Sequence, residues 1–281
     1  MGLVSPASGS AVVPTVQKES ADFTLYGETA GGWGNSTTTL SNPGPTLYVY
    51  QGENVSITLY AGDNIPHNWF IDFNGNNRVD AGEVSSRDFS SSTNAVVFNF
   101  TVPTDRIGPS TYLCRYHTLT MRGQIVILTP PEITPYGSQV TGWGFANNTT
   151  ANPGPTLYMR YGTNLTIHLI SLDGPRVDHT WFVDYSGDGT STGELTSNLF
   201  NSTAPTTYVY TPDRTGNFTY LCSIHPTSMT GTIVILGNVP APSGGFKIDL
   251  IPGIMVATII AVLVLAAVYQ VRAVRAARRQ K

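Results

Sequence analysis

The chain has 281 residues, of which 41% are hydrophobic and only 12% charged, and it contains 28 glycines and 19 prolines. This length suits two ordinary domains, and the many turn-forming residues favour an all-β protein over a helical bundle. Residues 1–245 hold 9 basic and 17 acidic side chains, which argues against nucleic acid as a partner because a nucleic-acid-binding protein carries a basic surface. A basic docking partner fits this charge, since charge complementarity mainly raises the rate of encounter.

Residues 1–20 form a leader of small and polar residues, which we expect to be disordered. Its longest apolar run, Ala11–Val13, ends at Pro14 and is much shorter than the apolar region of a secretory signal. The leader therefore shows no signal peptide.

After the leader, the sequence repeats itself. Four segments recur: GWG at 32–34 and 142–144, NPGPTLY at 42–48 and 152–158, HNWFIDFNG and HTWFVDYSG starting at His67 and His179, and TYLC followed by GxIVIL ending at Leu128 and Leu236. We therefore place one domain over residues 21–129 and a second over residues 130–237.

Short runs within each repeat have the pattern of β-strands. Apolar and polar residues alternate over Val55–Tyr60 and again over Leu165–Ile170. Gly, Pro, Asn and Asp separate these runs, and no segment before Leu250 shows a helical period. The pattern predicts a β-sandwich in each repeat.

The segment Thr111–Met121, TYLCRYHTLTM, spaces Cys114, His117 and Met121 as Cys-x2-His-x3-Met. Thr219–Met229, TYLCSIHPTSM, repeats this spacing. Thiolate, imidazole and thioether form a soft donor set that favours copper over magnesium or calcium. A blue-copper centre needs two histidines, one cysteine and a weak axial methionine, so each segment supplies three of its four ligands.

A histidine upstream of each cysteine supplies the fourth ligand. His67 and His179 both lead into an aromatic strand, 47 and 43 residues before the cysteine of their repeat. Two strands of one sandwich can bring residues at this separation to the same end of the fold. The predicted copper ligands are His67, Cys114, His117 and Met121 in the first repeat and His179, Cys222, His225 and Met229 in the second.

The two cysteines allow other interpretations. Cys114 and Cys222 could form a disulfide, or each could be a buried structural thiol. A disulfide requires Cα atoms within about 7 Å, which is hard to achieve from equivalent positions in two separate cores. Each thiol is also followed by a histidine and a methionine, so we favour metal ligation.

Each repeat resembles a cupredoxin, the blue-copper fold of plastocyanin and its relatives, in Pro66–Asn68 and in the Cys-x2-His loop with its downstream Met. NPGPTL also resembles early strands of multicopper oxidase domains. The resemblance implies Greek-key sandwiches and places His117 and His225 near the surface as the port for the electron. It also implies that the residue after the first ligand ties the two ligand loops together. Thr180 stands there in the second repeat, so we expect the two reduction potentials to differ.

His168 is the remaining histidine, and its alternating strand predicts a structural or surface role. A trinuclear copper cluster needs several His-x-His pairs, and the chain has none. A type 2 site like that of nitrite reductase needs three histidines, which His168 could supply only together with copies from other subunits. An enzyme is therefore the alternative to an electron carrier.

The segment DFNGNNRVDAGE matches positions 1, 3, 5, 9 and 12 of a calcium loop with the residues Asp72, Asn74, Asn76, Asp80 and Glu83. Asn77 replaces the usual glycine at position 6, and no helices flank the loop. A solvated turn is the simpler interpretation. The second copy, from Asp184 to Glu194, is one residue shorter and out of register.

The C-terminal region predicts a membrane anchor. Leu250–Tyr269 has no charged residue and is long enough to cross a bilayer as a helix. We place a stalk at 238–247, the transmembrane helix at 248–270 and a basic tail at 271–281, cytoplasmic by the positive-inside rule. Eight Asn-x-Ser/Thr sequons agree with an extracytoplasmic location for the rest of the chain; they begin at Asn35, Asn54, Asn99, Asn147, Asn148, Asn164, Asn201 and Asn217.

Together, the motifs and the resemblance lead us to expect a membrane-anchored copper protein that transfers electrons, with one type 1 copper per repeat. The membrane anchor is an arrangement similar to that of archaeal blue copper proteins. The expected partners of this protein are redox proteins or a membrane oxidoreductase. A copper-delivery protein without a redox role is a third interpretation.

Overall fold

The computed structural model describes residues 21–237, and within this range the chain is all β. Among these residues no helix is long and apolar enough to span a membrane. The leader, stalk, transmembrane helix and basic tail predicted from the sequence lie outside the described residues. The prediction that the two repeats are all β is confirmed over residues 21–237.

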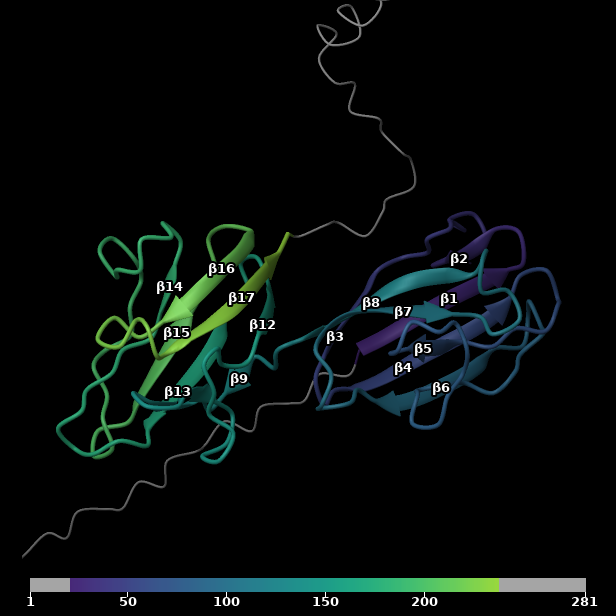
Figure 1. Ribbon diagram of the computed structural model, residues 1–281. Helices are drawn as coiled ribbons and strands as arrows, with labels where there is room; N and C mark the ends of the chain where they lie inside the picture. The colour runs from purple at the N-terminus through teal and green to yellow at the C-terminus, as the bar shows by residue number, and fades with distance from the viewer. Residues whose placement is uncertain (1–20, 238–281) are drawn as a thin grey trace, which may run out of the picture. The chain divides into compact units, whose positions relative to one another are not determined.

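The first repeat, residues 21–129, forms two four-stranded sheets (Figure 1). One sheet has the order β2 (Gly32–Gly34), β1 (Ala21–Glu28), β4 (Asn54–Ala61), β6 (Val96–Thr101). The other has the order β3 (Leu47–Tyr50), β8 (Arg122–Leu128), β7 (Gly108–Leu113), β5 (Phe70–Asp72). The pairs β1–β4 and β3–β8 are parallel and the other pairs are antiparallel. Because β5 and β6 lie in different sheets, as do β6 and β7, the chain crosses repeatedly between the two layers.

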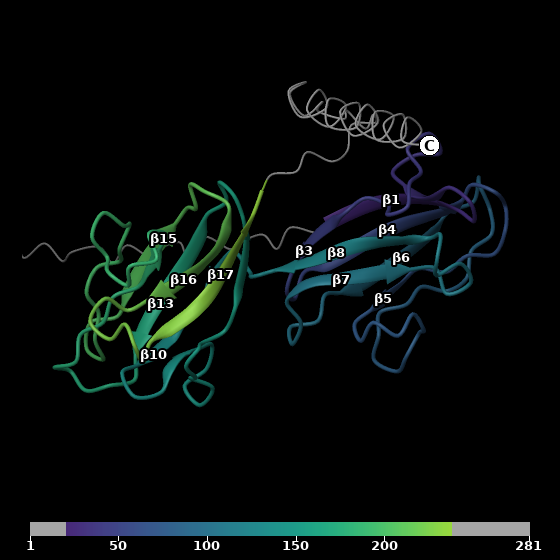
Figure 2. The same cartoon turned by 45° about the horizontal axis from the view of Figure 1, so that its top comes forward.

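Alternating side chains hold the two sheets together. Strand β4 buries every second residue, so Ile57 and Leu59 point inward. They join one core cluster with Val49 and Ile127 from the other sheet, and Figure 2 shows that sheet with β3, β8 and β7 side by side. Burial of a side chain of this size contributes about 1.5–3 kcal/mol. The sandwich is therefore stabilised by its interior.

The second repeat, residues 130–237, has the same strand order. One sheet contains β11 (Gly142–Gly144), β10 (Tyr136–Ser138), β13 (Leu165–Ser171) and β15 (Thr206–Tyr210), and β9 (Glu132–Ile133) also pairs with β13. The other contains β12 (Leu157–Arg160), β17 (Thr230–Leu236), β16 (Gly216–Leu221) and β14 (Phe182–Asp184). Strands β9 and β10 together replace β1. Pro135 stands between them, where it can donate no ladder hydrogen bond.

A tyrosine anchors the strand that leads to each cysteine. The Tyr112 hydroxyl donates to the carbonyl oxygen of Pro45 at 2.7 Å, and Tyr220 does the same to Pro155. Gly123 lies against the Tyr112 ring so closely that a Cβ would sit 2.2 Å from the ring atom Cζ. The recurring NPGP and GxIVIL segments thus fix the strand two residues before Cys114.

Candidate metal centres

In the first repeat, three predicted ligands meet at one end of the sandwich. His67 lies in the loop between β4 and β5, Cys114 directly follows β7, and His117 lies in the loop that leads to β8. The Nδ1 atoms of His67 and His117 are 3.2 Å apart, and the Cys114 sulfur lies 3.8 and 3.6 Å from them. His67 and Cys114 are fully buried, whereas His117 is half-buried.

The same arrangement occurs in the second repeat. The Cys222 sulfur lies 3.9 Å from Nδ1 of His179 and 3.7 Å from Nδ1 of His225. The two imidazole centroids are 5.0 Å apart, against 5.1 Å for His67 and His117. His225 is again the half-buried member.

These distances fit a first-row metal ion. An ion bound at about 2.05 Å from each nitrogen and about 2.3 Å from sulfur, with the three donors at about 120°, sets N–N near 3.5 Å and N–S near 3.8 Å. The donor atoms within each group lie within 4.8 Å of one another, close to that triangle. Each group could therefore hold a metal ion, and a soft His2Cys donor set suits copper.

The outer nitrogen of each upstream histidine faces a carboxylate. Nε2 of His67 lies 2.9 Å from Oδ1 of Asp63, and Nε2 of His179 lies 3.0 Å from Oδ2 of Asp173. In the first repeat the contact is a hydrogen bond, which leaves Nδ1 for the metal and fixes the orientation of the ring. In the second repeat the carboxylate is equally close but lacks hydrogen-bond geometry. Burial lowers the pKa of both histidines, although the neighbouring carboxylates oppose the shift. The neutral imidazole, the form that binds metal, is thereby favoured.

The carboxylates are themselves held in place. Asp63 accepts hydrogen bonds from the Thr29 amide and hydroxyl, at 2.8 and 2.9 Å, and from the Ile65 amide at 3.1 Å. Partial burial alone would raise the pKa of Asp63, but these bonds and the contact with His67 lower it to about 2. Asp173 accepts from the Ser138 hydroxyl and the Gln139 amide. Each carboxylate thus connects its histidine to the loop after β1 or β10.

The surroundings of the Cys114 thiol oppose its ionisation in the absence of a metal ion. Burial raises the pKa of Cys114, while hydrogen bonds from the backbone of Asn68, Tyr116 and His117 lower it in part. In the second repeat the Thr180 amide points at the Cys222 sulfur at 3.4 Å. A metal ion displaces the thiol proton on binding, and these amides would then stabilise the thiolate.

The methionines close the ligand loops. Cys114 donates its amide to the Met121 carbonyl at 3.0 Å, and Met121 donates to the His117 carbonyl at 2.8 Å. Met121 and Met229 are fully buried. A Cβ on Gly27 would lie 2.5 Å from Cε of Met121, and the same position in the second repeat, Gly137, would give 2.7 Å to Met229. Glycine makes room for the thioether side chain in both repeats.

The residue after the first histidine behaves differently in the two repeats. The Thr180 hydroxyl lies 2.7 Å from the Ser223 hydroxyl and accepts the Ser223 amide at 2.9 Å, so it ties the two ligand loops together. Asn68 instead donates to the Ser85 hydroxyl and the Ser86 carbonyl. Its buried Oδ1 has no hydrogen-bond partner among the described residues. The resemblance predicts the tie at both positions, and the side-chain tie is present at Thr180 only.

The surfaces beside the half-buried histidines also differ. In the first repeat Arg115 donates to both carboxylate oxygens of Asp88 at 2.6 Å, and Tyr116 joins the same cluster. In the second repeat the corresponding surface exposes Leu199 and Ile224. One rim is charged and aromatic, and the other is aliphatic.

His168 lies apart from both groups. It sits on β13 with Nε2 2.7 Å from Oε1 of Glu132 and Nδ1 3.0 Å from the Thr207 hydroxyl. Within residues 21–237 there are two groups of three or more metal-binding side chains at close range. His168 belongs to neither. It is a surface histidine on the β-sheet, as the sequence predicts.

The Asp72–Glu83 loop is closed by its own hydrogen bonds. The Asp72 carboxylate accepts the Gly75, Asn76 and Asn77 amides, and Asp80 accepts the side-chain amides of Asn74 and Asn76. Asn77 adopts φ 59°, a left-handed conformation that Asn tolerates. The shorter loop of the second repeat repeats the pattern, since Asp184 accepts the Gly187 and Gly189 amides. Calcium binding here stays a prediction.

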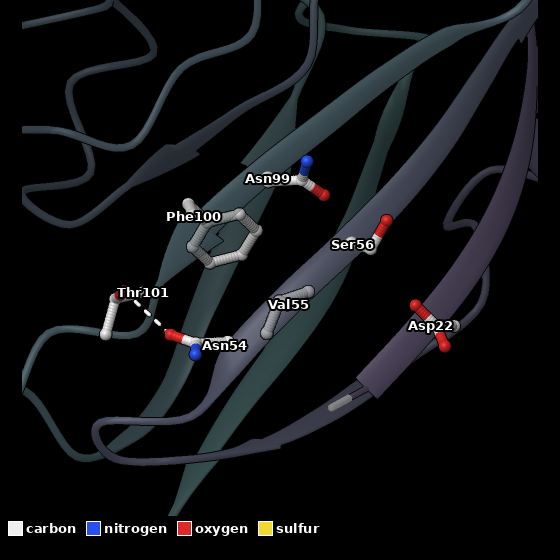
Figure 3. Close-up of a pocket in the computed structure, with 7 residues that line it drawn as sticks. All are labelled: Asp22, Asn54, Val55, Ser56, Asn99, Phe100 and Thr101. Atoms are coloured by element: carbon white, nitrogen blue, oxygen red, sulfur yellow. Dashed lines mark hydrogen bonds between the residues drawn. The ribbon is translucent and has the colours of Figure 1, made fainter. Parts of the chain in front are cut away.

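A surface recess in the first repeat lies far from the metal ligands. Figure 3 shows its lining, which contains no histidine or cysteine. Asn54 marks the start of β4, and Thr101 donates its hydroxyl to Asn54. His67 follows the other end of β4, so the recess and the metal group lie at opposite ends of the sheet.

Four residues of the metal centres did not emerge from the sequence. Asp63 and Asp173 contact the buried histidines, and Gly27 and Gly137 make room for the methionines. Each pair occupies equivalent positions in the two repeats. A comparison of the repeats residue by residue, outside the ligand motifs, would have indicated them.

No protein-family model matches the chain, and no curated protein matches it. Several solved structures do match the chain. Auracyanin A, a blue copper protein from Chloroflexus aurantiacus, is 18% identical over 39% of this chain and 99% of its own, with a TM-score of 0.30. A blue copper oxidase from Nitrosomonas europaea is 12% identical over 84% of this chain and 92% of its own, with a TM-score of 0.30. A copper-containing nitrite reductase from Thermus scotoductus is 17% identical over 81% of this chain and 64% of its own, with a TM-score of 0.28.

These similarities are too low to carry the argument further, and they include both a blue copper protein and enzymes. The assignment of the fold and of the metal centres rests on the geometry of the chain itself. Each repeat is a two-sheet sandwich with a His–Cys–His group at one end. This confirms the resemblance to cupredoxins noted in the sequence.

Proposed function

We propose that this chain is a membrane-anchored electron-transfer protein made of two Greek-key cupredoxin domains, residues 21–129 and 130–237, each with one type 1 copper. The observation that carries the proposal is the convergence, in both repeats, of a buried distant histidine on the cysteine loop at near-ligand distances. Copper bound there would cycle between two oxidation states. The rigid sandwich would keep the donors in place through the cycle.

Each ligand has a distinct role in this proposal. The thiolate would bind copper strongly and supply a covalent path for the electron, and the two imidazoles would complete the donor set. Met121 and Met229 would supply the weak axial contact that tunes the potential. The half-buried His117 and His225 would pass the electron to redox proteins or to a membrane oxidoreductase.

The proposed location is the extracytoplasmic side of a membrane. The charge-free segment Leu250–Tyr269 and the basic tail support it. Seven of the eight sequon asparagines are exposed in the structure, and Asn201 is half-buried. Glycosylation of exposed sequons is typical of an extracytoplasmic surface.

The test is an absorption spectrum of the copper-loaded full chain together with its copper content. We expect an intense visible thiolate-to-copper band and two coppers per chain. Cys114→Ser and Cys222→Ser should each remove one copper and part of the band, and the double variant should be colourless. The matched control, His168→Ala, should change neither. A colourless wild-type protein contradicts the proposal.

An enzyme, a copper oxidase or a reductase resembling nitrite reductase, is the alternative. It would require copper beyond two per chain together with turnover of substrate. His168 is exposed enough to meet ligands from other subunits, but its ring nitrogens already contact Glu132 and Thr207. If the wild-type protein binds more than two coppers per chain and His168→Ala binds two, the enzyme is favoured.

A further inference from the structure

A continuous line of aromatic rings runs through the core of the second repeat. Successive ring centroids lie 5.3–6.3 Å apart along His179, Phe200, Trp143, Tyr220, Trp181 and Tyr210. Trp181 and Tyr220 are each two residues from a metal-binding side chain, His179 and Cys222. The line therefore starts at the metal group both by contact and through the backbone.

The line ends in a pair of phenols. The hydroxyls of Tyr210 and Tyr185 are hydrogen-bonded to each other. Tyr210 is 1% exposed and Tyr185 is half-buried, so the pair reaches solvent through Tyr185. Tyr210 pairs with Leu165, the first residue of β13, whereas His179 follows the last. The pair and the metal group thus lie at opposite ends of the sandwich.

The first repeat has the same packing without the hydroxyls. Phe100 pairs with Val55 as Tyr210 pairs with Leu165, so Phe100 occupies the position of Tyr210. Phe73 follows β5 as Tyr185 follows β14, and both rings lie under an arginine, at 5.3 and 4.3 Å from its guanidinium carbon. Phenylalanine therefore satisfies the packing at both positions.

The hydroxyls of the second repeat need another explanation. A buried hydroxyl costs free energy unless it is hydrogen-bonded, and even then it gains little over an apolar ring. Burial raises the pKa of Tyr185 and of Tyr210, so both phenols stay protonated at neutral pH. What a hydrogen-bonded phenol can do and a phenyl ring cannot is lose one electron and one proton together.

We propose that Tyr185 and Tyr210 form a second redox site in this repeat, one that a strong one-electron oxidant, such as an oxygen-derived radical, oxidises at the end far from the copper ligands. Tyr210 gives its electron to the oxidant and its proton to the Tyr185 hydroxyl, and Tyr185 releases a proton to water. The resulting phenoxyl radical regains an electron through Trp181 and Tyr220 from copper(I) held by Cys222, which becomes copper(II), and a proton from water. This proposal rests on the copper function proposed above.

The first test uses the full chain loaded with zinc, which has no redox chemistry of its own. A ruthenium(III) tris-bipyridine complex, generated by a light flash, serves as the oxidant. We expect a tyrosyl radical in the electron paramagnetic resonance spectrum that is lost in the double variant Tyr185→Phe, Tyr210→Phe. The control, Tyr60→Phe, removes a phenol from the stacked Tyr26–Tyr60 pair of the first repeat and should leave the signal unchanged. A radical that survives in the double variant overturns the proposal.

The second test uses copper(I)-loaded chain and the same flash. In Cys114→Ser, which keeps the second centre, we expect the radical to decay as the copper(II)–thiolate band grows. In Cys222→Ser, which lacks that centre, we expect no such coupled change. Growth of the band that is the same in the double tyrosine variant overturns the link to copper. If copper gives no thiolate band at all, the copper function fails, while the zinc experiment still decides whether the phenols are a redox site. Phenylalanine at both positions of the first repeat indicates that the double variant folds.

Discussion

Oδ1 of Asp63 lies 2.9 Å from Nε2 of His67, on the side of the imidazole opposite Cys114. The carboxylate makes one ring nitrogen unavailable and presents the other, Nδ1, to the thiol and to His117. In the second repeat Oδ2 of Asp173 lies 3.0 Å from Nε2 of His179, a close contact without the hydrogen-bond geometry of the first repeat. Because both aspartates also bond to the loop after the first strand, the metal-binding histidine is positioned from outside the ligand motif.

We predict that Asp63→Asn weakens metal binding at the first centre by about tenfold or more, the size of effect that the loss of an outer partner of a metal-binding histidine has. The substitution keeps the shape but removes the negative charge that favours Nδ1 as the ligand atom. Affinity is measured by competition with a chelator in a Cys222→Ser background, so that only the first centre reports. Asp88→Asn, a carboxylate on the rim that pairs with Arg115, is the control. Equal effects of the two substitutions would show that Asp63 has no special role.

Gly27→Ala should disturb the position of Met121. The new Cβ would lie 2.5 Å from Cε of Met121 and 2.8 Å from the Trp33 ring, so both must move. Overpacking of this kind costs about 1–3 kcal/mol, which urea unfolding measures. If Met121 is the axial ligand, the visible band of the copper-loaded protein shifts as well.

Gly174→Ala is the matched control for this substitution, because no atom lies within 4 Å of its added Cβ. It should leave both stability and spectrum unchanged. A Gly27→Ala protein as stable as Gly174→Ala would mean that Met121 finds another position at no cost.

Thr180→Val should loosen the second centre. Valine keeps the shape of threonine but cannot bond Ser223, whose amide and hydroxyl both lie within 2.9 Å of the Thr180 hydroxyl. Loss of a partner for a partly buried group costs about 1–3 kcal/mol, and Ser223 follows the ligand Cys222 directly. We expect lower stability and faster loss of metal to a chelator. Thr180→Ser retains the hydroxyl and should behave like wild type, so similar loss rates for the valine and serine proteins would rule out the tie.

The strands and the candidate ligands were predictable from the sequence because their signals are local. The alternation in β4 and β13 follows from one buried face per strand, and Cys114, His117 and Met121 share one short loop. His67 could be added because its motif recurs in the second repeat.

The tie at Thr180 was expected from the resemblance to cupredoxins, whereas the contact of Asp63 did not emerge from the ligand motifs, because it depends on which loops the fold brings together. Asp63 lies four residues before His67 and Asp173 six residues before His179, so spacing does not reveal the shared role. The direction of the Asn68 side chain depends on Ser86, 18 residues away along the chain. The division of the first strand into β9 and β10 was missed as well, although Pro135 marks it in the sequence.

The last prediction concerns the tyrosine that anchors each cysteine strand. Tyr112→Phe removes the hydroxyl that donates to the Pro45 carbonyl at 2.7 Å in the buried core and leaves that carbonyl without this donor. We expect a loss of about 1–3 kcal/mol in the free energy of unfolding. Because the strand places Cys114 two residues later, we also expect weaker metal retention in the first centre and unchanged retention in the second. Tyr60→Phe, on a half-buried stacked ring, is the control and should cost less. If Tyr112→Phe lowers stability and leaves metal retention intact, the anchor supports the fold alone and the cysteine is held by its own loop.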